Sequence, residues 1–357
     1  MKKNLIALAV LAASGVASAQ STVTLYGLVD AYVGSFKTKT SVPGAAGTSI
    51  RQSVINGSGF NTSRFGLKGS EDLGGGLKAN FLLESGFDVS TGTANSYSNP
   101  FTPGTASSQK QSAVFGRQSW VGVSGAFGEA KLGKMWTPYD DVKGLGAAAF
   151  DANIFAPANN VWLSNSYEDR PGNAIYYATP DISGFSAAAM YAFGENKTSA
   201  PAVAGNAGNI SSFNVKYAGG PVAVALAYQA EKRGGVLTAE PTTKFTQLNA
   251  SYDFGVAKLL AAAGNVKNVN HAAGKAKEYQ IGVDVPLGAF TVSGGYARSK
   301  LTVASVDVKS RGFGLAGKYD LSKRTFLYAG LQAAKNDGGA LGEVKTETYA
   351  VGVQHKF

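Results

Sequence analysis

Charged side chains placed among alternating apolar residues are the part of this sequence best suited to chemistry. Arg64 and Lys68 stand in one such stretch, and Lys78 and Glu84 stand in the next. In an extended strand successive side chains point to opposite faces, so the members of each pair share one face. Charges that line an aqueous passage bias the movement of ions through it without making or breaking bonds.

The acidic counterpart lies in the longest connecting segment, residues 136–170. Asp140 and Asp141 stand near its start, Arg170 stands at its end, and an apolar stretch covers 144–155. A connection of this length inside a compact fold is usually functional. Its apolar middle needs a wall to pack against, so we expect the segment to fold inward and narrow the passage.

Bond-making chemistry has little support in this sequence. The two histidines, His271 and His355, have no evident nucleophile or metal partner, and the chain has no cysteine. Adjacent carboxylates such as Asp140 and Asp141 are more often electrostatic than catalytic, and the Gly74–Gly76 run lacks the lysine of a phosphate-binding loop. We therefore expect neither an enzyme nor a metal or cofactor site.

Alternation with a period of two is the dominant pattern along the chain. Leu248 and Tyr252 fall on one face of a strand, while Gln247 and Asn249 fall on the other. The opposite faces are rich in Gly, Ser, Asn and Gln, which suits a wet interior with apolar side chains turned to lipid. Only a closed barrel satisfies every backbone hydrogen bond of such strands within a membrane.

Sixteen segments carry this pattern, and short Gly- or Pro-rich turns alternate with long Ser-, Thr- and Gly-rich loops. An even number of strands, joined alternately by short turns and long loops, is typical of bacterial outer-membrane barrels. A barrel of sixteen strands encloses an aqueous channel. The fold class is therefore predicted as all-β, a 16-stranded antiparallel transmembrane β-barrel with a constriction loop in its lumen. The expected strands are 23–37, 61–72, 77–88, 113–124, 128–135, 173–179, 185–195, 211–218, 222–231, 244–254, 256–266, 278–286, 290–299, 310–320, 325–334 and 346–357.

Strand phase turns Arg64, Lys68, Lys78 and Glu84 toward the lumen. It does not determine whether Arg117 faces the lumen or the lipid. If Val121 and Val123 face lipid, then Arg117 does too; if Trp120 faces lipid, Arg117 faces inward.

The first residues predict an exported protein. Lys2 and Lys3 precede a short apolar run, and Ala17–Ala19 is a small-residue cleavage site. We expect residues 1–19 to be a signal peptide and residues 20–357 to form one barrel domain. The net charge of +10 falls to +8 without Lys2 and Lys3. The basic residues are scattered along an exported chain, so nucleic acid is not an expected partner.

Several ordered stretches resemble the trimeric general porins of Gram-negative bacteria, especially those of β-proteobacteria. They are SRFGLKGSEDLGGGLKANF at 63–81, FGRQSWVGVSGAFGEAKLGK at 115–134, NAIYYATPDISGF at 173–185, YDLSKRT at 319–325 and the terminal VGVQHKF.

The resemblance implies a homotrimer in the outer membrane and an eyelet in which wall arginines face acidic loop residues. Arg64, Arg117 and Arg170 take the arginine places, and Glu84, Asp140 and Asp141 take the acidic ones. It thereby implies an inward Arg117 and a preference for anions. Leu28 departs from relatives that carry a lysine on the first strand.

The implied function is general diffusion of small hydrophilic solutes and ions, with Lys68 and Lys78 as further lumen charges. The alternative is a substrate-specific channel for an organic anion or a sugar, for which Tyr26, Tyr32 and Tyr328 have inward phase. The expected partners are outer-membrane lipid and lipopolysaccharide, and the assembly machinery through the terminal Phe357.

Overall fold

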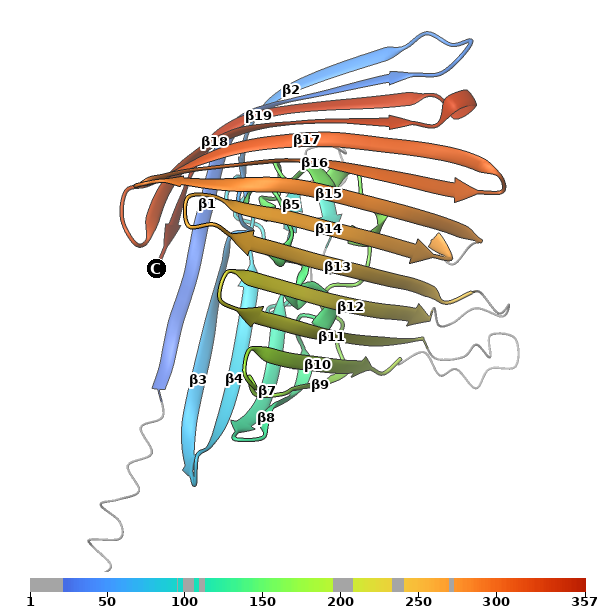
Figure 1. Ribbon diagram of the computed structural model, residues 1–357. Coiled ribbons are helices and arrows are strands. Elements are labelled where there is room, and N and C mark those ends of the chain that lie inside the picture. Colours follow the sequence, from blue (N-terminus) through green and yellow to red (C-terminus); the bar gives the residue numbers. More distant parts are fainter. Residues whose placement is uncertain are drawn as a thin grey trace, which may run out of the picture.

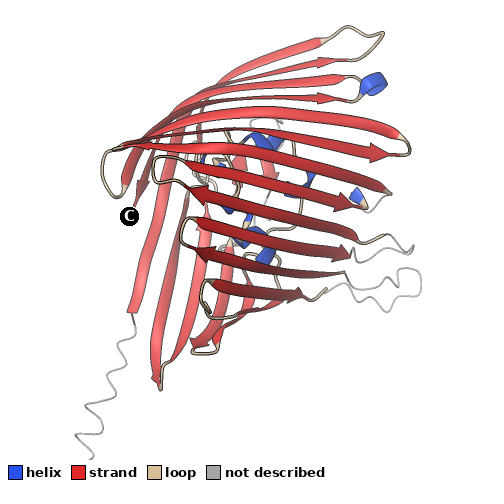
Figure 2. Ribbon diagram, viewed as in Figure 1, coloured by secondary structure: helices blue, strands red, loops and turns tan. Residues whose placement is uncertain are grey.

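The computed structural model describes residues 22–94, 96–98, 106–108, 113–194, 208–232, 241–269 and 273–357. The expected signal peptide, residues 1–19, lies outside these ranges. Seventeen described strands form one sheet, and neighbouring strands within it run antiparallel (Figures 1 and 2). Their bounds are β1 Thr22–Ser41, β2 Thr48–Gly57, β3 Arg64–Gly74, β4 Leu77–Gly86, β7 Gln118–Gly125, β8 Gly128–Lys134, β9 Ala174–Ala178, β10 Phe185–Ala192, β11 Asn209–Gly219, β12 Val222–Lys232, β13 Thr243–Asp253, β14 Lys258–Lys267, β15 Gly274–Leu287, β16 Phe290–Val303, β17 Val306–Asp320, β18 Thr325–Asp337 and β19 Glu343–Lys356.

The sheet closes on itself because the first strand pairs with the last. One edge of β1 pairs with β19, from Leu28↔Lys356 to Ser41↔Glu343. Its other edge pairs first with β3 over residues 22–28 and then with β2 over residues 31–40. Strands β2 and β3 therefore share one position in the ring, and the described strands fill sixteen positions, as expected from the sequence. The expected strands do not include β2, which falls between the expected strands 23–37 and 61–72.

The two faces of the sheet follow the predicted alternation. On β13, Leu248 and Tyr252 are exposed on the outer face, while Gln247 and Asn249 are buried on the inner face. On β19, Tyr349 and Val351 are exposed in the same way, and Gln354 is buried. The outer face is thus an apolar band suited to lipid, and the inner face is polar or small.

The connection between β8 and β9 packs against the inner face of β11 to β18 through a series of short helices. They are α2 Pro138–Asp141, η1 Lys143–Leu145, η2 Ala149–Asp151, η3 Pro157–Asn160 and η4 Leu163–Asn165. Figure 2 shows these helices in blue behind the strands. Outside this connection, η6 is Gly339–Leu341, and β5 Ser96–Ser98 pairs with β6 Ala106–Ser108 in a separate sheet. In the described part of the chain no helix has the length and apolar character to cross a membrane.

Glycines on the inner face allow the connection to approach the strands closely. A side chain at Gly282 of β15 would place its Cβ 2.5 Å from the Cβ of Ala148. A Cβ at Gly295 of β16 would meet the same Ala148 atom, and one at Gly314 of β17 would meet the carbonyl oxygen of Phe155. Glycine at these positions is therefore required by packing.

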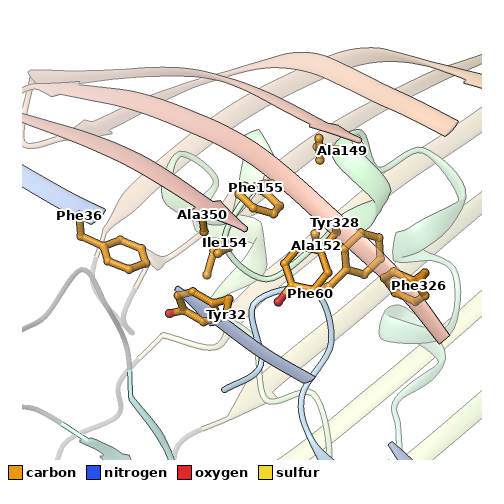
Figure 3. Close-up of a cluster of buried hydrophobic side chains, with 11 residues drawn as sticks. Tyr32, Phe36, Phe60, Ala149, Ala152, Ile154, Phe155, Phe326, Tyr328 and Ala350 are labelled. Atoms are coloured by element: carbon orange, nitrogen blue, oxygen red, sulfur yellow. The ribbon is translucent and has the colours of Figure 1, made fainter. Parts of the chain in front are cut away.

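A buried apolar cluster fixes the connection to the wall formed by β1, β17, β18 and β19 (Figure 3). The Phe60 ring lies 5.3 Å from Phe150 and 5.4 Å from Tyr328, centroid to centroid. Phe155 packs edge-on against Tyr328 at 6.1 Å. Aromatic pairs at these separations add attraction beyond their buried area, so this end of the connection is held firmly.

Candidate functional site

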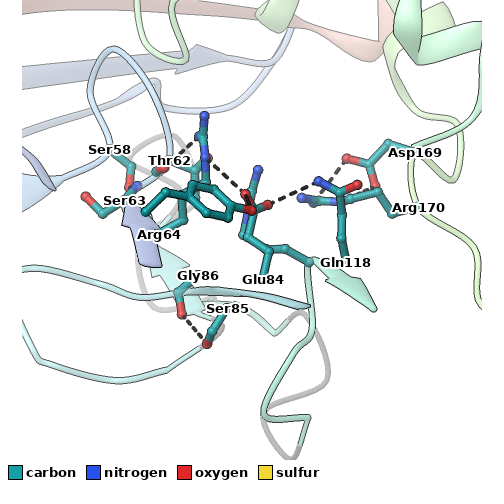
Figure 4. A network of polar contacts seen from close by, with 12 residues as sticks. Ser58, Thr62, Ser63, Arg64, Glu84, Ser85, Gly86, Gln118, Asp169 and Arg170 are labelled. Carbon is teal, nitrogen blue, oxygen red and sulfur yellow. Dashed lines mark hydrogen bonds and ion pairs between the residues drawn. The ribbon is translucent and has the colours of Figure 1, made fainter. Parts of the chain in front are cut away.

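Glu84 of β4 is the centre of a cluster of charges on the inner face (Figure 4). Its Oε1 accepts a hydrogen bond from Nε of Arg117 at 2.8 Å, and its Oε2 lies 3.4 Å from Nε of Arg64. The hydroxyl of Tyr26 donates to Oε2 at 3.0 Å, and Gln118 donates weakly at 3.5 Å. The carboxylate is therefore fully engaged, and it neutralises only one of two adjacent guanidinium groups.

The turn between β2 and β3 positions Arg64. The carboxylate of Asp30 accepts hydrogen bonds from the backbone N–H groups of Gly59 at 2.8 Å and Asn61 at 3.0 Å, and from the hydroxyl of Tyr328 at 2.6 Å. These bonds hold residues 58–63 in a turn that separates β2 from β3. The strand β3 begins directly after this turn, at Arg64. Because Asp30 is completely buried, every one of its acceptors must be satisfied within the protein.

Arg117 lies immediately before β7, which begins at Gln118. Val121 and Val123 do face outward, but strand alternation ends before it reaches Arg117, and the side chain turns to Glu84. This explains why phase alone could not place this residue.

The Trp136 ring contacts both Arg117 and Arg170, the third arginine of the cluster. The guanidinium carbon of Arg170 lies 4.2 Å from the centroid of the indole ring, and that of Arg117 lies 5.5 Å from it. Arg170 also pairs with the neighbouring Asp169, with Nη2 3.1 Å from Oδ2. Its Nη1 is buried and has no hydrogen-bond partner within the described ranges. The arginines thus come from three separate elements and meet in one region.

The arginines differ in exposure and retain their charge. The side chain of Arg64 is 28% exposed, whereas those of Arg117 and Arg170 are 11% and 6% exposed. Burial, together with the nearby Arg170 and Arg64, lowers the pKa of Arg117 to about 10. Arg117 therefore remains protonated at neutral pH, and Arg64 is the most accessible of the three arginines.

The loop carboxylates expected opposite the arginines have other partners. The hydroxyl of Tyr167 donates to Oδ1 of Asp140, and that of Tyr176 donates to Oδ2 of Asp141 at 2.9 Å. Among the described residues, the loop carboxylate that pairs with an arginine is Asp169. Asp169 was not among the expected eyelet residues, and its position next to Arg170 in the sequence was the signal available. Trp136 carried no comparable signal, and the inward phase of Tyr26 did not identify Glu84 as its partner, because both contacts depend on tertiary packing.

Burial raises the pKa of Asp140 to about 6. Asp169 and Asp151 raise it further, while Lys143 and the hydrogen bond from Tyr167 act in the opposite direction. This loop group therefore changes its charge close to neutral pH.

Lys68 and Lys78 lie toward the turn end of the inner face. Lys68 lines a hollow of about 360 Å³ with Asn80, Trp120 and Glu129, and its ammonium group lies 5.3 Å from the Tyr26 ring centroid. Lys78 is exposed near the start of β4. Among the described residues, neither lysine forms an ion pair with Glu84 or Asp169, the carboxylates of the arginine cluster.

The side chains considered for other functions lie elsewhere. Tyr32 and Tyr328 are 3% exposed and belong to the apolar cluster, so they offer no track to a solute. His355 is exposed on the outer face of β19, where its Nδ1 lies 2.8 Å from Oγ1 of Thr325. His271 lies outside the described residues.

A closed barrel with an apolar exterior, a polar interior and an interior cluster of charges defines an outer-membrane channel. The sequence matches the family model for Gram-negative porins over residues 6–339, and the chain belongs to this family. It is 37% identical to Outer membrane porin protein 32 of Delftia acidovorans, over 99% of this chain and 95% of that protein.

Solved structures share the fold. An anion-selective porin from Comamonas acidovorans superimposes with a TM-score of 0.71 at 30% identity and covers 94% of this chain and 100% of its own. An outer-membrane protein of Vibrio cholerae in a trimer form gives a TM-score of 0.65 at 16% identity, over 94% of this chain and 99% of its own, which supports the fold alone. The protein is an outer-membrane porin.

Proposed function

We propose that this porin is a general diffusion channel that passes small hydrophilic solutes and ions and prefers anions. The observation that carries the proposal is the convergence of three arginines: Arg64 and Arg117 share the wall carboxylate Glu84, and Arg170 lies beside Arg117 at the Trp136 ring. Even with Asp169 included, cationic groups exceed anionic ones by one. Walls of low dielectric constant extend such a field into the lumen and raise the local concentration of anions.

The connection between β8 and β9 serves, in this proposal, as the constriction loop. Its contacts with glycines of β15 to β17 support a fixed position on the inner wall. Asp140 and Asp141 supply negative charge on this loop, beyond the arginine cluster, and Lys68 and Lys78 supply positive charge toward the turn end.

Assembly and export form part of the same proposal. Resemblance to general porins favours a homotrimer, export through a signal peptide at residues 1–19, and a barrel domain at residues 20–357. We also propose contacts with lipopolysaccharide and recognition of Phe357 by the assembly machinery. The backbone of Phe357 exchanges two hydrogen bonds with Gly27 of β1, which would tie such a signal to barrel closure.

Planar-bilayer recording under a KCl gradient tests the function. We expect conductance steps that occur in threes, a linear current–voltage relation and a reversal potential of the sign for chloride. A cation-selective reversal potential would contradict the charge assignment. Saturable block by one sugar or organic acid at low concentration would favour a substrate-specific channel instead.

A further inference from the structure

The arginine cluster consists of two groups that no carboxylate joins. On the wall, Arg64 and Arg117 share Glu84, with nitrogen–oxygen distances of 3.4 and 2.8 Å. On the connection between β8 and β9, Arg170 pairs with the neighbouring Asp169 at 3.1 Å. Figure 4 shows Arg64 on one side of Glu84 and Arg170 on the other. Among the residues that the structure describes, no ion pair links the wall group to the loop group.

Trp136 is the side chain that bridges the two groups. Its ring centroid lies 4.2 Å from the guanidinium carbon of Arg170 and 5.5 Å from that of Arg117. The face of an indole ring attracts a cation within about 6 Å of its centroid, and the attraction grows when the cation is removed from water. Both arginines are buried, so the ring attracts each of them under favourable conditions.

The backbone places Trp136 at the neck of the connection between β8 and β9. The residue follows β8, which ends at Lys134, and precedes Thr137, the N-cap of α2. The two ends of the connection meet here. The N–H of Thr137 donates to the carbonyl oxygen of Asp169 at 2.9 Å, and the ammonium group of Lys134 donates to the carbonyl oxygen of Arg170. Trp136 and Arg170 therefore stack across a closed neck.

Arg170 depends on the indole ring for part of its stabilisation. Its Nε and Nη2 lie 3.3 and 3.1 Å from the carboxylate oxygens of Asp169, whereas its buried Nη1 has no hydrogen-bond partner within the described ranges. A buried charge with an unmatched N–H group is costly unless other groups stabilise it. The face of Trp136 supplies such stabilisation without adding a negative charge.

The type of residue at position 136 therefore affects the net charge of the cluster. Glu84 joins its two arginines by cancelling one positive charge. An indole attracts two cations through its ring quadrupole and carries no net charge of its own. The mutual repulsion of Arg117 and Arg170 is thus opposed without being neutralised, and three arginines remain against two carboxylates.

We infer that Trp136 is a positioning residue for ion selectivity, because it holds Arg117 and Arg170 together in the lumen without neutralising them. In the absence of the ring, repulsion between the two guanidinium groups would move Arg170 away from the wall arginines. The positive field in the lumen would then weaken. The inference rests on the proposed preference for anions and assigns a residue that maintains it.

Reversal potentials of the purified full-length porin under a KCl gradient test this role. W136L removes the aromatic face, and W136F retains one and serves as the rescue variant. We expect the chloride-to-potassium permeability ratio to fall about two- to fivefold in W136L. The upper limit corresponds to the loss of one unit charge about 8 Å from the permeating ion. W136F should stay within about twofold of wild type, because a phenyl ring also attracts a guanidinium group.

The matched control is W120L. Trp120 of β7 also has a cation over its ring, with Nζ of Lys131 4.8 Å from the centroid. Among the described residues, no arginine stacks on this ring. The W120L variant should therefore keep the wild-type permeability ratio.

A double-mutant comparison separates an effect through Arg170 from a general packing effect. W136L/R170Q should lie within about twofold of R170Q, because the cation that the ring positions is already absent. An additive loss in W136L/R170Q would overturn the inference. Equal ratios in W136L and wild type, equal losses in W136L and W120L, or a loss in W136F as large as that in W136L would overturn it as well.

The wild-type reversal potential tests the proposed function separately. A cation-selective wild type would contradict that function, whereas the shift from wild type to W136L tests Trp136 whatever the sign of the wild-type value. Single-channel conductance verifies that each variant has folded and inserted. If W136L fails to insert, R170K keeps the charge but lacks the planar group that stacks on an indole, and it should lower the ratio. An unchanged ratio in R170K would then overturn the inference.

Discussion

Replacement of Arg64 by glutamine is the most direct probe of the charge cluster. Glu84 would keep its 2.8 Å bond to Arg117 and its 3.0 Å bond from Tyr26, so the buried carboxylate is not left alone. The Arg64 side chain is 28% exposed, compared with 11% for Arg117. R64Q should therefore remove accessible positive charge while preserving the fold. R117Q would instead leave a buried carboxylate without its closest partner, which typically costs about 3–5 kcal/mol.

The size of the effect follows from Coulomb's law. A unit charge about 8 Å from a permeating ion contributes about 0.5 kcal/mol at the dielectric constant of water, before screening. This energy has opposite signs for chloride and potassium, so the difference between them changes by about 1 kcal/mol. The chloride-to-potassium permeability ratio should therefore fall by roughly fivefold.

The assay is the reversal potential under a KCl gradient, with wild type, R64Q and R64Q/R170Q compared in the same bilayers. R324Q serves as the control, because it removes an exposed positive charge from the short turn between β17 and β18, outside the arginine cluster. Reversal potentials that remain at the wild-type value in both R64Q and R64Q/R170Q would refute the assignment of these arginines to the eyelet.

Two further predictions concern the loop. Because burial raises the pKa of Asp140 to about 6, this carboxyl is neutral below pH 6 and charged above it. The preference for anions should therefore weaken as the pH rises from 5 to 7. The D140N variant should lose this pH dependence of ion selectivity. If D140N keeps the full pH dependence, another titrating group is responsible for it. A methyl group at Gly295 would collide with Ala148, whereas one at Gly294 would meet a methyl of Leu315 on the outer face at 3.1 Å. We expect G295A to displace the loop and change single-channel conductance, and G294A to leave it near the wild-type value; equal conductance in G295A and wild type would contradict the packing role of Gly295.

Much of the barrel could be predicted from local sequence alone. The alternation at Leu248, Asn249 and Tyr252 assigned their faces correctly, because a strand places successive side chains on opposite sides whatever its neighbours are. The turn glycines marked the short connections, and closure followed from the need to satisfy every backbone group in lipid. The strand β2 was missed because its outward face includes Arg51 and Ser53, which weakens the apolar period.

The charge cluster depended on tertiary structure to a much greater extent. Strand phase could orient Arg64 and Glu84, because both lie on strands with a clear period. It could not orient Arg117, which lies outside β7, nor decide which loop carboxylate meets an arginine. Those contacts depend on how the segment between β8 and β9 seats on the glycines of the wall.

The sequence by itself thus determined an exported barrel with a polar interior and an apolar exterior, since period and composition act residue by residue. The tertiary structure alone decided that Asp169 pairs with Arg170 and that Trp136 lies between two arginines. It also decided which distant residues stand opposite one another, such as Arg298 of β16 and Arg311 of β17. Pairing register sets these neighbours, and register arises only when distant segments of the chain meet.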